Sequence, residues 1–174
     1  MGFTMPTTRP VRSVFSEGHK RKFLVVVDEA PEVETALFFA ANRVYRTGGS
    51  ITLLFIIEPS EEQTWAGVKE IYIEEQTAKA QAVFRLFRRK LKLSGFEDIQ
   101  VDDVIRQGKK ADQILAQIQD DSDIAVLVLG ASTDPKGPGP LVTSIATGKL
   151  AGSFPIPITI VPGTLSPEEI KGLA

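Results

Sequence analysis

The sequence has no cysteine and only one histidine among its 174 residues. Without cysteine, the chain cannot form disulfides, use a thiolate nucleophile or bind a metal through thiolates. His19 lies in a polar segment between Gly18 and Lys20, where no predicted helix or strand holds its imidazole in place. Ser-His-Asp triads and histidine metal sites need such a held imidazole, so we expect no catalytic residues.

Long apolar runs are missing as well. No segment has the roughly 18 consecutive apolar residues of a transmembrane helix, and residues 1–22 lack the apolar core of a secretory signal. The net charge of −2 gives no general attraction to nucleic acids or membranes. We therefore expect a cytoplasmic protein without nucleic-acid or membrane partners.

The two ends of the chain are expected to be tails. Residues 1–21 combine Pro, Ser and Thr with basic residues, a composition typical of a flexible basic segment. A basic arm that contacts an acidic partner is the alternative. Between this segment and a C-terminal tail at 164–174, residues 22–163 are predicted to form a single domain.

Buried strands and amphipathic helices alternate through that domain. Runs of β-branched and aromatic residues predict strands, and apolar residues at intervals of three and four predict helices. The predicted strands cover 23–27, 50–59, 99–108, 123–130 and 156–163, and the predicted helices cover 33–44, 62–94, 109–120 and 141–151. Pro157 places the last strand at an edge of the sheet, because proline cannot donate to a ladder.

This strict alternation predicts an α/β fold in which right-handed crossovers build a doubly wound, five-stranded parallel sheet with helices on both faces. Ligands of such sheets bind beyond the carboxyl ends of the strands, at the point where the strand order reverses. The candidate site residues therefore end or follow the predicted strands: Asp28, Glu29, Ile57, Glu58, Gly108 and Gly130.

The helix predicted over 62–94 divides its charges between its halves. Glutamates dominate the first half, and arginines and lysines dominate the second, which complements the helix dipole. We interpret these charges as a solvated face. Because apolar residues are interleaved with the basic ones, a nucleic-acid or membrane surface is the alternative.

The loop after the strand at 123–130 lacks the standard phosphate motifs. A Walker A loop is absent, because Leu150 stands where Ser or Thr is needed and Thr143 stands where Gly is needed. The G-x-G-x-x-G dinucleotide fingerprint is also absent after the first strand. What remains is Thr143 and Ser144 near a predicted helix start, where hydroxyls and backbone amides either hold a phosphate or cap the helix.

In their order and spacing, these segments resemble the universal stress protein family over residues 22–163. The matching pieces are VVVDEAPE, SITLLFIIEP, VIRQGKKADQIL, DIAVLVLGAS and FPIPITIVPG. The resemblance implies the adenine nucleotide alpha hydrolase-like fold with strand order 3-2-1-4-5. It also implies a homodimer joined through the last strand, at about 156–162.

ATP-binding members of that family carry G-x-x-G, nine further residues and G-S/T after the fourth strand. Laid on this sequence without a gap, the motif keeps Gly130 and Ser144, but Thr133 and Thr143 occupy two of its glycine positions. A branched side chain narrows the approach of a phosphate and disfavours positive φ. Three prolines in the same loop also lack the N–H group with which a backbone binds phosphate.

The resemblance thus implies a non-catalytic stress-response protein that binds ATP or AMP, with Mg²⁺, weakly or in altered form, and in which any ATP hydrolysis is slow and incidental. Asp28 is implied to contact the ribose or a metal-bound phosphate, and Ile57 the adenine. The implied binding residues are Asp28, Glu29, Ile57, Gly108, Gly130, Ala131, Thr133, Thr143, Ser144 and Ile145. The alternative is a dimeric module that binds no nucleotide and acts through protein partners.

Overall fold

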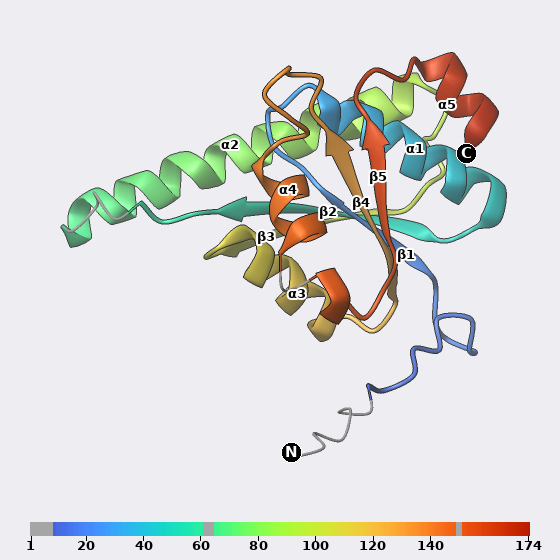
Figure 1. Cartoon of the computed structure of the whole chain (residues 1–174), viewed down its shortest axis with the longest axis horizontal. Helices are drawn as coiled ribbons and strands as arrows, with labels where there is room; N and C mark the ends of the chain where they lie inside the picture. Colours follow the sequence, from blue (N-terminus) through green and yellow to red (C-terminus); the bar gives the residue numbers. More distant parts are fainter. Residues whose placement is uncertain (1–8, 61–64, 149–150) are drawn as a thin grey trace.

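One five-stranded parallel sheet forms the centre of the computed structural model, which describes residues 9–60, 65–148 and 151–174 (Figure 1). The strands are β1 (Lys22–Val26), β2 (Ser50–Ile57), β3 (Val101–Gln107), β4 (Ile124–Ala131) and β5 (Ile158–Pro162). Their order in the sheet is β3-β2-β1-β4-β5. The predicted doubly wound fold and its strand order are confirmed, and the last strand lies at an edge.

Helices cover both faces of the sheet. They are α1 (Glu32–Thr47), α2 (Ala66–Leu93), α3 (Lys110–Asp120), α4 (Pro140–Thr147) and α5 (Pro167–Leu173), with a short 3₁₀ helix η1 at Ala151–Ser153. The cores on the two faces show that α1 and α2 pack on one face, and α3 and α4 on the other. Within the described residues, no helix has the length and apolarity needed to span a bilayer.

Strand β1 supplies side chains to both cores in alternation. Phe23 and Val25 belong to the core beneath α1 and α2, whereas Leu24 and Val26 belong to the core beneath α3 and α4. Successive side chains of a strand point to opposite faces, so a strand buried on both faces is apolar throughout. This is why the sequence of β1 reads as a continuous apolar run.

The chain leaves the neighbouring strands β1 and β4 in opposite directions. After β1 it continues into α1 on one face, and after β4 it continues into α4 on the other. Such a divergence opens a crevice at the carboxyl ends of the two strands, which is where ligands of doubly wound sheets bind. The candidate site is therefore at this end of β1 and β4.

The C-terminal residues differ from the expected tail, because they form the helix α5 at the side of α1. Ser166 and Glu169 make a reciprocal capping box in which the Glu169 N–H donates to Ser166 Oγ over 3.1 Å. Ile170 is buried. A serine three residues before a glutamate marks a helix start in sequence, but only the packing against α1 gives so short a helix a reason to form.

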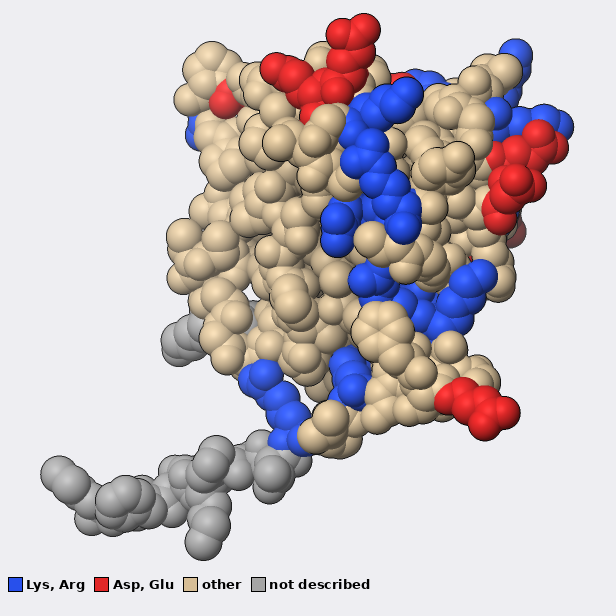
Figure 2. All heavy atoms as spheres, turned by 90° about the vertical axis from the view of Figure 1, so that its right-hand side faces the viewer, with Lys and Arg blue, Asp and Glu red and all other residues tan. Residues whose placement is uncertain are grey.

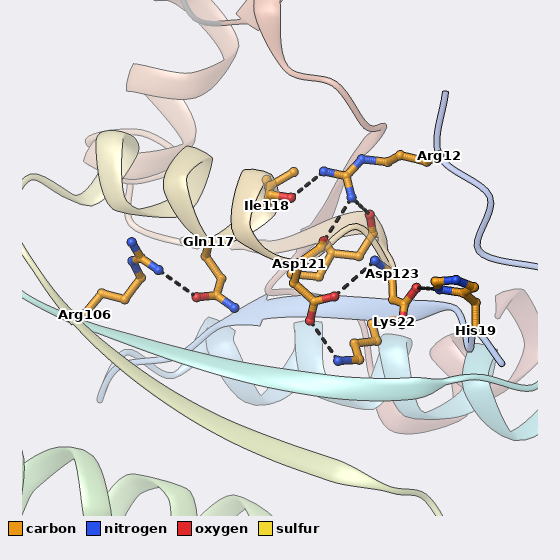
Figure 3. Close-up of polar contacts among 9 residues, drawn as sticks. Arg12, His19, Lys22, Arg106, Gln117, Ile118, Asp121 and Asp123 are labelled. Atoms are coloured by element: carbon orange, nitrogen blue, oxygen red, sulfur yellow. Dashed lines mark hydrogen bonds and ion pairs between the residues drawn. The ribbon is translucent and has the colours of Figure 1, made fainter. Parts of the chain in front are cut away.

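The N-terminal residues from 9 to 21 also differ from the expected flexible tail. Arg12 donates to the carbonyls of Asp121 over 3.0 Å and Ile124 over 2.9 Å, and to that of Ile118 (Figure 3). These carbonyls lie at the end of α3 and just beyond it, and α3 has no basic residue in its last turn. Because the last carbonyls of a helix lack partners within the helix, Arg12 supplies donors that α3 itself does not.

Arginine plays the same part for other helices at the amino end of the sheet. Arg21 donates to the carbonyl of Gly48 after α1 over 3.1 Å, and Arg46 donates to that of Lys171 in α5 over 2.6 Å. Figure 2 shows basic side chains in a column down this side of the molecule. Cations are favourable at helix C-termini, so Arg21 and Arg46 stabilise the ends of α1 and α5.

Asp121 links the starts of β1 and β4. Its carboxylate lies 2.8 Å from Lys22 Nζ and accepts from the Asp123 N–H over 3.0 Å (Figure 3). The hydrogen bond to Asp121 raises the pKa of Lys22. A raised lysine pKa contributes stability below the pKa of the unfolded chain, and this contribution is lost as the pH rises through the folded-state pKa.

Replacing Arg12 by alanine is expected to lower the free energy of unfolding by about 1–3 kcal/mol, because buried carbonyls lose a charged donor. Urea denaturation followed by circular dichroism measures this change. Lys20→Ala is the matched control, since Lys20 is exposed and forms no ion pair with the described residues. Equal stabilities of the two variants would mean that the hydrogen bonds of Arg12 contribute nothing to the stability of the fold.

Candidate functional site

Asp28 lies just beyond β1 in a tight turn that leads into α1. Its carboxylate accepts a hydrogen bond of 2.7 Å from the Ala30 N–H, a local contact typical of aspartate in turns. The side chain borders a hollow of about 190 Å³ at the ends of β1 and β2. Asp28 therefore has the position that the sequence predicts for it.

That hollow has a mixed lining, with apolar side chains from β1 and β2 and polar side chains around them. It is lined by Val26, Asp28, Ile56, Glu58, Tyr72 and Lys110, among others. The Tyr72 hydroxyl donates to the Glu58 carbonyl over 2.9 Å, and the Lys110 N–H donates to Glu58 Oε1 over 3.1 Å. The sequence analysis missed Tyr72, whose one signal is a polar tip on the sheet-facing side of a helix.

A second hollow of about 610 Å³ lies at the loop after β4. It is lined by Glu32, Ser132, Asp134, Lys136, Thr143 and Ser144, among others. The lining thus carries two carboxylates and a single lysine, a balance that disfavours a phosphate. Among the described residues, none lines both this hollow and the one beside Asp28.

The loop after β4 uses its own backbone donors. The Ser132 N–H donates to the Pro138 carbonyl over 2.9 Å, and the Gly137 N–H donates to the Asp134 carbonyl over 3.0 Å. The N–H groups of Asp134 and Lys136 donate to side chains of the same loop. With three prolines that have no N–H, few backbone donors are left for a phosphate.

The backbone of this loop does not need glycine where the family motif has it. Positive φ occurs at Gly137, with 128°, and at Gly139, with 102°, whereas no described residue other than glycine has positive φ. Thr133 and Thr143 therefore sit in ordinary backbone conformations. The Thr143 N–H donates to the carbonyl of Gly139, the N-cap of α4, over 3.1 Å, so Thr143 is an ordinary residue of the first turn of that helix. The positions of this loop with positive φ are Gly137 and Gly139, not Thr133 and Thr143.

Gly130 has a reason to be glycine that involves no ligand. A Cβ built on it would lie 2.3 Å from the carbonyl oxygen of Glu32, the first residue of α1. Real Cβ atoms do not approach backbone this closely, so any side chain would force β4 and α1 apart. The retention of Gly130 therefore reflects strand–helix packing and is not by itself a sign of phosphate binding.

Two predicted site residues point into the cores and not into the crevice. Ile57 and Ile145 are each 1% exposed, in the cores on the two faces of the sheet. Ile57 does not line the hollow at the ends of β1 and β2, whereas Ile56 and Phe55 do, and the implied contact of Ile57 with adenine stays a prediction. Ile56 points to the opposite face from Ile57, whereas Phe55 shares the face of Ile57 and lines the hollow from two residues earlier in β2.

Gly108, Ala131 and Glu29 serve local structure. Gly108 has a φ of 139°, and its N–H donates to the Ile57 carbonyl over 3.0 Å. The Ala131 carbonyl accepts from the Gly163 N–H over 2.9 Å. Glu29 Oε2 lies 3.1 Å from Lys79 Nζ on α2. In the described part of the chain, no group of three or more His, Asp or Glu residues is placed to hold a metal.

The strand order and the divergence of the chain after β1 and β4 define a doubly wound α/β protein. A family model described as "Universal stress protein family" matches residues 20–162. The chain therefore belongs to the universal stress protein family. A search among curated proteins finds no match.

Solved structures of the same family share the fold. Universal stress protein UspA from Lactobacillus plantarum is 17% identical with a TM-score of 0.65, covering 82% of this chain and 97% of that one. An Archaeoglobus fulgidus universal stress protein in complex with dAMP is 17% identical with a TM-score of 0.56, covering 81% and 97%. An Arabidopsis thaliana family protein with AMP bound is 15% identical with a TM-score of 0.53, covering 82% and 91%.

Gly130→Ala is expected to lower the free energy of unfolding by about 1–3 kcal/mol, because the added methyl group collides with the backbone of α1. Gly152→Ala is the control, since a Cβ at Gly152 meets nothing within 4 Å. Thermal or urea unfolding without any nucleotide measures both variants. A Gly130→Ala variant as stable as its control would show that β4 and α1 can separate freely.

Proposed function

We propose that this universal stress protein is a non-catalytic, cytoplasmic stress-response protein that binds an adenine nucleotide weakly, through its base and ribose more than through its phosphates. The observation that carries the proposal is the separation of the two hollows. Asp28 borders a hollow of mixed polar and apolar lining at the exits of β1 and β2, while the backbone donors of the loop after β4 bond within that loop. Family members with dAMP and AMP bound support the choice of ligand.

The weakness of binding follows from size and charge. Ligand pockets generally have volumes of about 300–1,000 Å³. Of the two hollows that Asp28 borders, the one at the ends of β1 and β2 is smaller, at about 190 Å³, and the one against α2 is at the low end of this range, at about 360 Å³. On the phosphate side, Glu32 and Asp134 oppose the single Lys136. Each phosphate added to the ligand brings more negative charge toward those carboxylates. AMP is therefore the preferred form in this proposal, and ATP the weaker ligand.

In this proposal Mg²⁺ binds only together with the phosphates of the nucleotide. Mg²⁺ is usually held by one or two carboxylates together with substrate phosphates, and Asp28 is the carboxylate that the sequence predicts there. A ligand that reaches the site mainly through its base and ribose needs no resident metal. Any hydrolysis remains slow and incidental in this proposal.

We further propose a homodimer through β5. This strand is at one edge of the sheet, where a row of backbone groups is open to pairing with another chain. Ile160 in the middle of β5 is 40% exposed. The charge of the phosphate-side hollow also favours the second candidate function, a dimeric module that binds no nucleotide and acts through protein partners.

Calorimetry with AMP and with ATP tests the nucleotide proposal. We expect measurable AMP binding and weaker ATP binding, with Asp28→Asn weakening AMP binding by about tenfold, or about 1.4 kcal/mol. The asparagine oxygen can still accept from the Ala30 N–H, so the turn is kept. Asp98→Asn, a change on an exposed loop, is the control. Absence of heat with AMP up to about millimolar concentration leaves the interaction module as the function.

The double variant Thr133→Gly, Thr143→Gly separates the two explanations of the altered loop. We expect its ATP affinity to stay within about threefold of the parent, because the prolines and the internal hydrogen bonds of the loop remain. The same calorimetric titration measures it. If the double variant binds ATP tightly, the two threonine side chains alone close the site.

A further inference from the structure

A row of exposed side chains follows the outer face of α2 along most of the helix. All of its members are exposed: Val68, Ile71, Glu75, Ala78, Ala82, Leu86, Arg89 and Leu93. We call this row the α2 seam. Its four large apolar members are strongly exposed, at 52% for Val68, 57% for Ile71, 48% for Leu86 and 77% for Leu93.

The α2 seam is a second apolar face, separate from the one that holds α2 on the sheet. The inner face buries Ala80, Phe84, Phe87 and Leu91, and this face alone explains why the helix forms and where it packs. Seam members follow one another at intervals of three and four residues, the spacing by which one helix packs along another. A helix face that contacts only solvent usually carries polar residues and has no need of large apolar residues at this spacing.

The α2 seam is also symmetric about Ala82. Counting outward from Ala82 in both directions, Ala78 corresponds to Leu86 and Ile71 to Leu93. In an antiparallel pair of identical helices centred on Ala82, each of these residues faces its counterpart on the other copy. Apolar residues thus face apolar residues along the contact, as in the self-complementary interface of a two-fold dimer.

The charged members of the α2 seam complement each other in the same arrangement. Glu75 and Arg89 are equally far from Ala82 in sequence, so an antiparallel pair places each glutamate opposite an arginine of the second copy, twice by symmetry. Neither residue forms an ion pair with the described residues of its own chain. The helix dipole explains why acids precede bases in α2, but not why large apolar residues lie between them in solvent.

The shape of the molecule leaves the α2 seam accessible. The first half of α2 extends past the sheet (Figure 1), so another helix can lie along it without meeting the strands. Ala78 and Ala82 at the centre are small, which lets two helices approach closely. Beside Ala82 and Leu86 there is a hollow of about 360 Å³ against the start of α1, which offers room for side chains of a second copy.

We propose that a second copy of this chain docks on the α2 seam, forming an antiparallel helix pair with its two-fold axis at Ala82. This interface does not use the β5 edge, and it borders the nucleotide crevice only at the hollow beside Ala82, which Asp28 and Glu29 also line. If the β5 dimer also forms, the two interfaces together build a larger assembly from the same chain. The proposal does not depend on nucleotide binding.

Charge exchange at the seam tests the proposal by the mass in solution, measured by light scattering after size exclusion. Glu75→Arg or Arg89→Glu alone places like charges opposite each other, so each is expected to reduce the mass of the assembly twofold. The double variant Glu75→Arg, Arg89→Glu restores the opposite charges and the mass. Mixing the two single variants restores it as well, which a merely misfolded variant would not do.

Glu70→Arg is the matched control for the charge exchange, since Glu70 is an exposed glutamate of the same helix outside the α2 seam. It is expected to leave the mass unchanged. A wild-type protein with the mass of one chain overturns the proposal, and so does an unchanged mass in both single variants. An unchanged mass in both single variants is still compatible with a dimer through β5. Calorimetry with AMP measures nucleotide binding independently of this test.

A cross-link tests the position of the two-fold axis. Because the chain has no cysteine, Ala82→Cys introduces one thiol per chain, and the two thiols meet across the axis at a separation suited to a disulfide. Mild oxidation is expected to link Ala82→Cys into dimers, seen without reductant on a gel, and to link Gln81→Cys much more slowly, because Gln81 is turned away from the α2 seam. Equal linking of the two variants overturns the antiparallel pairing.

Discussion

The close contact between Gly130 and the carbonyl of Glu32 is the constraint on which the functional end of this molecule depends. It joins the end of β4 to the first turn of α1, and so sets how wide the crevice between β1 and β4 can be. Gly163 approaches the same place, since a Cβ on it would lie 3.0 Å from Glu32 Cβ and 3.2 Å from Thr133 Cγ2. This packing places Glu32 beside the hollow at the loop after β4, on the phosphate side of the crevice.

The loop after β4 has the length of the family's nucleotide-binding loop, but several of its backbone N–H groups are hydrogen-bonded within the loop. A phosphate site needs backbone N–H groups that point outward and have no other partner. Here the Ser132 and Gly137 N–H groups are satisfied within the loop, and its prolines have none to offer. Thr133 and Thr143 fit this backbone, because the positions of the loop with positive φ are Gly137 and Gly139. The fold of the family is kept, while Thr133 and Thr143 stand at two glycine positions of its phosphate motif.

Most elements could be predicted because their apolar patterns are local. The pattern of β1, buried on both faces, and that of α1 each specify an element without reference to the rest of the chain. The site could be predicted to the level of strand ends, which placed Asp28 correctly beside a hollow. For Ile57, its position at a strand end does not give the direction of its side chain. Which neighbour of a strand-end residue faces the crevice depends on the register of the strand in the sheet, and a one-residue difference reverses the face.

The sequence by itself determined the alternation of strands and helices, the edge position of β5 and the loss of motif glycines after β4. These features rest on the chemistry of single residues and on short repeats. Only the tertiary structure decided that Gly130 is needed by α1, that Arg12 completes α3 from more than a hundred residues away, and that one face of α2 is exposed among the described residues. Each of these depends on which distant surfaces meet, because burial and hydrogen-bond satisfaction are properties of the assembled fold and not of any one segment.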